Sequence, residues 1–148
     1  LFKKLKDEYD VTFVYITHDL STAYYVSDYV ATLYRGNLVE YGTAQAVLDT
    51  PAHPYTHLLL NSVPVVGEKW DEEEVEDADE ERKSYQLEGC KFAPRCPRAT
   101  QKCFDQRPDY TYIDHETGQH TKTAPTGKYS EAAHRVLCYY PLAEGEKP

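Results

Sequence analysis

Four cysteines are the residues whose type and spacing most clearly indicate chemistry. Cys90, Cys96 and Cys103 lie in the segment GCKFAPRCPRATQKC (89–103) with the spacing C-x5-C-x6-C, and Cys138 follows after 34 further residues. Four thiols can form two disulfides, bind a zinc ion or hold an iron–sulfur cluster. The sequence shows no cationic-then-apolar signal segment, so we expect a reducing compartment, in which disulfides are rare.

The cysteine spacing leaves two kinds of metal site open. Structural zinc sites usually contain a C-x2–4-C pair, and neither short interval here has that length. Iron–sulfur clusters are held by four cysteines with mixed spacings. Four bases and no acid lie between the first and third cysteines, namely Lys91, Arg95, Arg98 and Lys102. Bases beside thiols lower the thiol pKa and favour the metal-binding thiolate, but they do so for zinc and for iron alike.

A second candidate for chemistry is His18, which follows the segment VTFVYIT (11–17). This near-continuous β-branched and aromatic run predicts a strand that is buried on both faces. Open α/β sheets bind their ligands at the carboxyl ends of such strands, where His18 and Asp19 would lie. From the residues alone, His18 either contacts a ligand or hydrogen-bonds the loop that begins the next helix.

Helix and strand patterns fill residues 1–66 and would position these side chains. The expected elements are a helix over 1–9, the strand 11–17, a short helix over 22–28, a hairpin over 29–42 that turns at Arg35-Gly36-Asn37, a helix over 43–50 capped by Thr43, and a helix from Pro54 to Pro64. This order predicts the second half of an α/β domain.

Acidic residues are concentrated in one segment, 68–83, which holds ten acids and three bases in a chain of net charge −9. Such a run repels itself, so we expect a flexible acidic linker over 67–83 between two domains, 1–66 and 84–148. The second of these is rich in proline and cysteine and too short for a large core, so it needs a cross-link, such as a bound metal or disulfides, to be stable. No basic nucleic-acid patch is evident, and no apolar run approaches the roughly 20 residues of a membrane span.

A family resemblance rests on three short motifs that lie far apart in the sequence: THDL (17–20), HPYT (53–56) and GCKFAPRCP (89–97). The chain resembles the C-terminal part of an ABC transporter ATP-binding subunit of the oligopeptide/dipeptide (and nickel) importer family, over its whole length apart from the acidic run. The resemblance implies an α/β fold: the C-terminal portion of a P-loop NTPase (ABC ATPase) domain, followed by a small irregular cysteine-rich extension.

Site roles follow from the same resemblance. It implies that His18 is the switch histidine that contacts the γ-phosphate of ATP, and that Asp19 orients the loop. It implies that Cys90, Cys96, Cys103 and Cys138 hold a 4Fe–4S cluster, with zinc as the alternative, so that their sulfurs must converge. HPYT is interpreted as structural. The other histidines of the C-terminal part, His115, His120 and His134, are not expected to be ligands.

Motifs needed for ATP hydrolysis are not found in these 148 residues. The sequence has no G-x-x-x-x-G-K-S/T phosphate loop, no LSGGQ-like signature and no apolar strand ending in Asp-Glu for magnesium. The chain also begins at Leu1 and contains no Met, which indicates a piece of a longer protein. We therefore expect the chain alone to be inactive as an ATPase, with ATP and magnesium bound by the full-length parent.

The function that this resemblance implies is that of a fragment of the ATP-hydrolysing subunit that powers peptide import. The expected partners are transmembrane permease subunits and a second ATP-binding subunit, with the protein peripheral to the cytoplasmic face of the cell membrane. The alternative is a stand-alone metal- or iron–sulfur-binding regulatory module without an ATPase role. A truncated, non-functional gene product is a third possibility.

Overall fold

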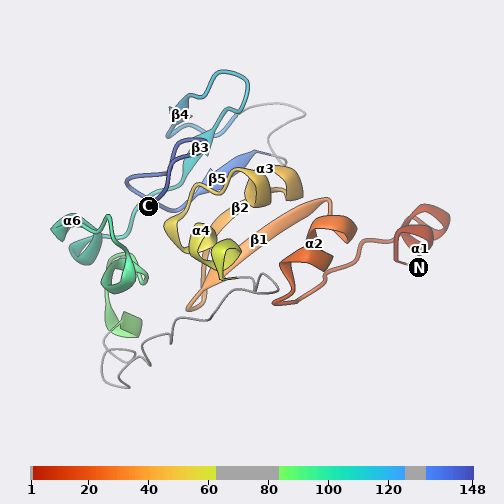
Figure 1. Ribbon diagram of the computed structural model, residues 1–148, viewed down its shortest axis with the longest axis horizontal. Coiled ribbons are helices and arrows are strands. Elements are labelled where there is room, and N and C mark those ends of the chain that lie inside the picture. The colour runs from red at the N-terminus through yellow and green to blue at the C-terminus, as the bar shows by residue number, and fades with distance from the viewer. Residues whose placement is uncertain (1, 63–83, 126–132) are drawn as a thin grey trace, which may run out of the picture.

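The computed structural model describes residues 2–62, 84–125 and 133–148, with side chains from residue 4 onward. Its strands form one five-stranded sheet in the order β1-β2-β5-β3-β4, and each neighbouring pair is antiparallel (Figure 1). The elements in chain order are α1 (Phe2–Tyr9), α2 (Leu20–Val26), β1 (Tyr29–Tyr34), β2 (Asn37–Thr43), α3 (Ala44–Asp49), α4 (Pro54–Asn61), η1 (Ala93–Arg95), α6 (Gln101–Asp105), β3 (Thr111–Ile113), β4 (His120–Thr121) and β5 (His134–Val136).

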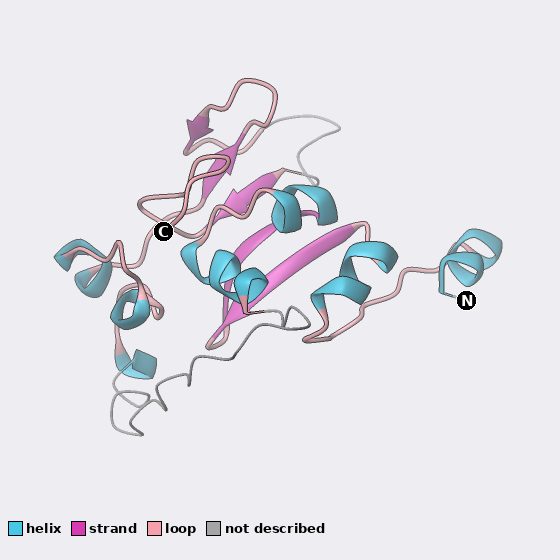
Figure 2. Ribbon diagram, viewed as in Figure 1, coloured by secondary structure: helices cyan, strands magenta, loops and turns pink. Residues whose placement is uncertain are grey.

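The β1–β2 hairpin forms where the sequence predicts it. Arg35 and Gly36 both have positive φ, 45° and 75°, as a two-residue type I′ turn requires. The Asn37 side chain donates a hydrogen bond to the carbonyl of Arg35 at 3.1 Å. Helices α3 and α4 lie over this hairpin (Figure 2), and Val47 of α3 is fully buried. The described residues thus form a mixed α/β fold built on an antiparallel sheet.

Each helix on this side of the sheet begins at a residue that caps it. Asp19 accepts hydrogen bonds from the backbone N–H groups of Ser21 and Thr22 at the start of α2. Thr43 accepts one from Ala46 at 3.2 Å and starts α3, as predicted. Helix α4 has Pro54 in its first turn, where the missing N–H leaves no bond unmade.

The predicted strand at 11–17 is wrong. No strand is assigned to these residues, which form an extended link between α1 and α2 (Figure 1). Val14 and Ile16 are 90% and 92% exposed. A strand that is buried on both faces needs a paired neighbour and cover on each side, and the described sheet supplies neither to this segment. His18 and Asp19 therefore do not lie at the end of a buried strand in this structure.

The sheet includes residues from both sides of the predicted linker. Strand β5 pairs with β2 through Glu40–Val136 and Tyr41–Arg135, and the amide of Leu137 donates to the carbonyl of Val39 at 2.8 Å. The acidic linker itself lies outside the described residues. The described part of 84–148 is thus held to the hairpin by β-sheet hydrogen bonds. Among the described helices, none is long and apolar enough to cross a membrane.

Candidate functional site

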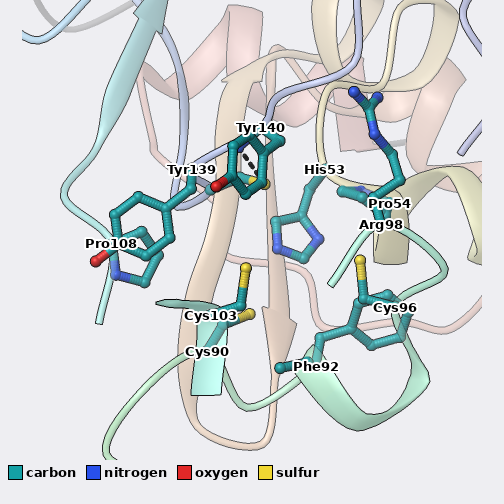
Figure 3. A pocket seen from close by; sticks show the side chains of 12 residues that line it. His53, Pro54, Cys90, Phe92, Cys96, Arg98, Cys103, Pro108, Tyr139 and Tyr140 are labelled. Atoms are coloured by element: carbon teal, nitrogen blue, oxygen red, sulfur yellow. Dashed lines mark hydrogen bonds between the residues drawn. The ribbon is translucent and has the colours of Figure 1, made fainter. Parts of the chain in front are cut away.

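The structure brings the four predicted cysteines together around one cavity of about 20 Å³, here called the cysteine cavity (Figure 3). Cys90 precedes η1, Cys96 is the residue that ends η1, Cys103 lies in α6, and Cys138 follows β5. None of the four is in a disulfide. Segments that are distant in the sequence therefore meet at one point, as closure of a four-cysteine site requires.

Close packing of the backbone holds two of these cysteines in place. The amide of Cys90 donates to the carbonyl of Cys103 at 2.7 Å. A Cβ atom on the preceding residue, Gly89, would lie only 2.2 Å from that same carbonyl oxygen. Only glycine permits so close an approach, because it has no side chain. The glycine of the motif GCKFAPRCP is therefore explained by the contact between the Cys90 loop and α6.

Hydrogen-bond donors face the cysteine sulfurs. The amide of Tyr140 donates to Cys138 Sγ at 3.4 Å, and the hydroxyl of Thr100 lies 3.6 Å from Cys103 Sγ. Backbone N–H groups near the other two sulfurs act to lower the pKa of those thiols, Phe92 and Ala93 at Cys90 and Arg98 at Cys96, against the larger effect of burial. Donors around sulfur are typical of metal–thiolate sites, where they orient the ligands and offset their charge.

Burial is the strongest influence on the pKa values of Cys90, Cys96 and Cys138. It raises the pKa of Cys90 and of Cys96, and it raises the pKa of Cys138 to about 12, with the other three cysteines contributing in the same direction. Cys90, Cys96 and Cys138 are therefore protonated at neutral pH, and a metal ion must displace those protons to bind. The prediction that neighbouring bases bring the pKa of Cys90 and Cys96 below its ordinary value is therefore wrong, because burial has the larger effect.

Three of the four bases have partners other than the thiols. Lys91 donates to the backbone carbonyls of Tyr85 and Leu87. The Lys102 ammonium lies 4.1 Å from the centre of the Tyr139 ring. Arg98 forms an ion pair with Glu146 at 3.0 Å and lowers the pKa of Cys96 only as a minor influence.

The fit of a metal to this cavity is good in donor chemistry and incomplete in geometry. One buried thiol, Cys103, and three half-buried thiols line the same cavity, and each has a hydrogen-bonding group beside it. As the side chains lie, however, no three His, Cys, Asp or Glu residues of the described chain are close enough together to hold one ion. The cavity has room for about one water-sized sphere, so the cysteine side chains must rearrange before either a cluster or a single ion can bind.

His53 is a residue of this cavity that the sequence interpretation assigned only a structural role. It caps α4, because its Nδ1 accepts the amide hydrogen of Tyr55 at 3.0 Å. The ring is 1% exposed and also lines the cysteine cavity, and its Nε2 has no hydrogen-bond partner among the described residues. Burial lowers the pKa of His53 to about 4, so the ring is neutral at pH 7. His53 is the first residue of the HPYT motif, but only the fold shows that its ring lines the cysteine cavity.

A buried carboxylate lies directly behind this helix start. Glu40 of β2 is fully buried and accepts hydrogen bonds from the amides of Ala52 and His53, at 2.7 and 3.0 Å. His134 Nε2 lies 2.7 Å from the same carboxylate, and His134 Nδ1 lies 2.8 Å from His115 Nε2. Sequence reasoning missed this network, although an acid within the apolar strand LVEY was a usable signal.

His18, the predicted switch histidine, is exposed at a bend before α2 and does not line the cysteine cavity. Asp19 orients this loop, since its side chain caps α2 and also accepts a hydrogen bond from the Thr22 hydroxyl. These bonds lower the pKa of Asp19 and keep it a carboxylate. Nothing in the described part of the structure tests whether His18 contacts a phosphate, so that role stays a prediction.

Comparison with known proteins identifies relatives of this chain. The family model described as "Oligopeptide/dipeptide transporter, C-terminal region" matches residues 39–103. The chain is 41% identical over 104 residues to the probable D,D-dipeptide transport ATP-binding protein DdpF of Escherichia coli (strain K12), a match that covers 70% of this chain and 34% of the relative. It is 34% identical over 116 residues to the dipeptide transport ATP-binding protein DppD of Caldanaerobacter subterraneus, with 78% and 36% covered.

A third relative is the oligopeptide transport ATP-binding protein AppD of Bacillus subtilis (strain 168), which is 34% identical over 119 residues. That match covers 80% of this chain and 36% of the relative. The chain thus spans about a third of the length of the curated relatives it matches. Residues 39–103 of the chain are thus similar to the C-terminal region of the oligopeptide/dipeptide transporter family.

Proposed function

We propose that the chain is the C-terminal part of an ATP-hydrolysing subunit that powers the import of dipeptides or oligopeptides. The match of residues 39–103 to the transporter C-terminal region, together with relatives that are named as peptide transport ATP-binding proteins, supports this proposal. The subunit works with transmembrane permease subunits and a second ATP-binding subunit at the cytoplasmic face of the membrane. ATP and magnesium bind to the parent protein, upstream of the described residues.

His18 is the residue to which we assign the switch role. A developing charge on the phosphoryl oxygens of ATP is stabilised by a positioned donor, and an imidazole supplies one at neutral pH. The structure supports this with an exposed His18 ring on a loop that Asp19 fixes by capping α2. The phosphate loop, the signature and the magnesium ligands come from outside this sequence, so the chain alone should not hydrolyse ATP.

Histidine 18 can be tested in the full-length gene product. His18→Ala should reduce the rate of ATP hydrolysis at least tenfold while nucleotide affinity changes little, because a contact made in the transition state is removed. His120→Ala, an exposed histidine in β4, is the matched control and should leave both quantities unchanged. An unchanged kcat in the His18 variant would refute the assigned role.

The cysteine cavity is assigned to a metal–thiolate centre held by Cys90, Cys96, Cys103 and Cys138. The observation that carries this assignment is that all four thiols, one buried and three half-buried, line one cavity, with a hydrogen-bonding group beside each sulfur. A 4Fe–4S cluster is the favoured occupant and zinc is the alternative. In either case the bound group joins α6, η1 and the segment after β5, and so staples the domain 84–148.

Metal analysis separates these occupants. Protein purified without oxygen should contain iron and acid-labile sulfide in near-equal amounts, or one zinc if the alternative holds. Cys138→Ser and Cys96→Ser should each abolish metal retention, because a four-ligand site loses its closure either way. Wild-type protein that retains neither iron nor zinc would overturn the assignment. A start codon immediately upstream of residue 1 in the gene would instead favour the stand-alone metal-binding module.

A further inference from the structure

The imidazole of His53 presents an unsatisfied nitrogen to the cysteine cavity. Its Nε2 atom is buried, lacks a partner among the described residues and belongs to a ring that is 1% exposed. In Figure 3 the ring lies among Cys90, Cys96 and Cys103. A buried polar atom without a hydrogen bond is costly, so native proteins rarely retain one unless something binds it.

The hydrogen bonds of the ring determine which nitrogen carries the proton. Nδ1 accepts the backbone amide hydrogen of Tyr55, so its lone pair is occupied and it carries no proton. A neutral imidazole has one N–H, which must then be on Nε2. His53 consequently offers the cavity a hydrogen-bond donor. To act as a metal ligand, Nε2 would have to lose this proton to Nδ1, where a second N–H would face the Tyr55 amide.

We propose that His53 donates its Nε2 hydrogen to a thiolate sulfur of the metal centre in the cysteine cavity and thereby tunes that centre. This inference rests on the proposed metal–thiolate function. With a metal bound, the cysteine sulfurs would carry the negative charge of the site, and all four cysteines line the cavity with His53. A donor to sulfur stabilises the more negative, reduced form, which raises the reduction potential of an iron–sulfur centre.

The fold holds this donor rigidly. The backbone amide of His53 is bonded to Glu40 at 3.0 Å, and the adjacent amide of Ala52 is bonded to the same carboxylate. On its other side the ring contacts Phe92, with 5.9 Å between the ring centres. Strand β2, through Glu40, therefore positions His53, so that the α/β part of the chain and the cysteine-rich part meet at this histidine.

Two substitutions separate the cavity-facing role of His53 from its capping role. In His53→Asn the amide oxygen replaces Nδ1 as the cap acceptor, but no donor extends to the position of Nε2. In His53→Gln the amide nitrogen reaches the position of Nε2, but the cap acceptor is lost. Both side chains are uncharged, so neither variant introduces a buried charge.

The full-length gene product, purified without oxygen, is the protein to use, and the reduction potential of its iron–sulfur centre is the readout. His53→Asn should retain iron and sulfide but lower the ratio of reduced to oxidised centre about tenfold at a fixed potential, equal to about 59 mV for one electron. His53→Gln should restore most of this shift. If the wild type instead holds zinc, cobalt substitution gives the readout, and only His53→Asn should shift the thiolate-to-cobalt absorption band.

Three other outcomes would each refute a specific part of the proposal. A metal-loaded His53→Asn protein with wild-type potential, or with an unshifted cobalt band, would refute the donor role and leave the metal centre intact. Loss of metal in both His53 variants, with circular dichroism unchanged, would make His53 a ligand and refute the donor assignment. A wild-type protein without metal would overturn the proposed centre and, with it, this role of His53.

Discussion

Replacing Glu40 with alanine should destabilise the chain by about 3–5 kcal/mol, the range for removing one partner of a buried ionic network. Glu40 is fully buried and accepts three hydrogen bonds, from the amides of Ala52 and His53 and from His134 Nε2, all at 3.0 Å or less. Alanine leaves these three donors without an acceptor. Each lost bond to a charged group is worth roughly 1.5–3 kcal/mol, and the relieved desolvation of the carboxylate offsets part of the sum.

Glutamine at the same position gives a graded version of the prediction. Its single oxygen can occupy the place of either carboxylate oxygen, and its NH₂ group then faces one of the two backbone N–H donors. When the amide oxygen replaces Oε1, only the His53 amide loses its acceptor, whereas in the reverse orientation the Ala52 amide and His134 Nε2 both lose theirs. In the better orientation Glu40→Gln should therefore lose about 1–3 kcal/mol. Because the loss is partial, this variant remains measurable even where the alanine variant unfolds.

Urea unfolding followed by circular dichroism measures both losses. The matched control is Glu116→Ala, at an exposed glutamate of the turn before β4, which should change the free energy of unfolding by less than about 0.5 kcal/mol. If Glu40→Ala were as stable as this control, the buried network would contribute nothing, and the account of how β2 positions α4 and His53 would be refuted.

Three further predictions follow from single positions. The folded protein holds the pKa of His53 at about 4, below its ordinary 6.5, so stability that is complete above pH 6.5 should fall by about 3 kcal/mol as the pH drops to 4. In metal-free chain, His53→Asn should lack this component of acid unfolding, and an identical pH dependence would contradict it. Gly89→Ala should prevent chemical cross-linking of the following cysteine to Cys103, because the added Cβ meets a carbonyl oxygen at 2.2 Å; Gly145→Ala, with no atom within 4 Å, should not. Gly36→Ala should cost about 1 kcal/mol in thermal unfolding, since alanine is strained at a φ of 75°, and an unchanged Tm would count against the type I′ turn.

Local interactions in this protein could be predicted from the sequence alone. The Arg35-Gly36 turn, the Thr43 cap and the Pro54 helix start each depend on residues within four positions of one another, and all three are present in the structure. The spacing of the cysteines likewise identified the residues that now line one cavity. Such features depend on backbone preferences and on side-chain chemistry that the sequence states directly.

Tertiary structure decided what depends on distant partners. The apolar run 11–17 has the composition of a buried strand, but a strand forms only where another strand pairs with it, and no strand among residues 2–62, 84–125 and 133–148 does so. The bases near Cys96 lowered no thiol pKa overall, because burial outweighs charges that are already paired. The inward donor on His53 and the buried Glu40 depend on β5 and α4 meeting β2. Burial and hydrogen bonding belong to the three-dimensional arrangement, since water is excluded only when segments far apart in sequence come together.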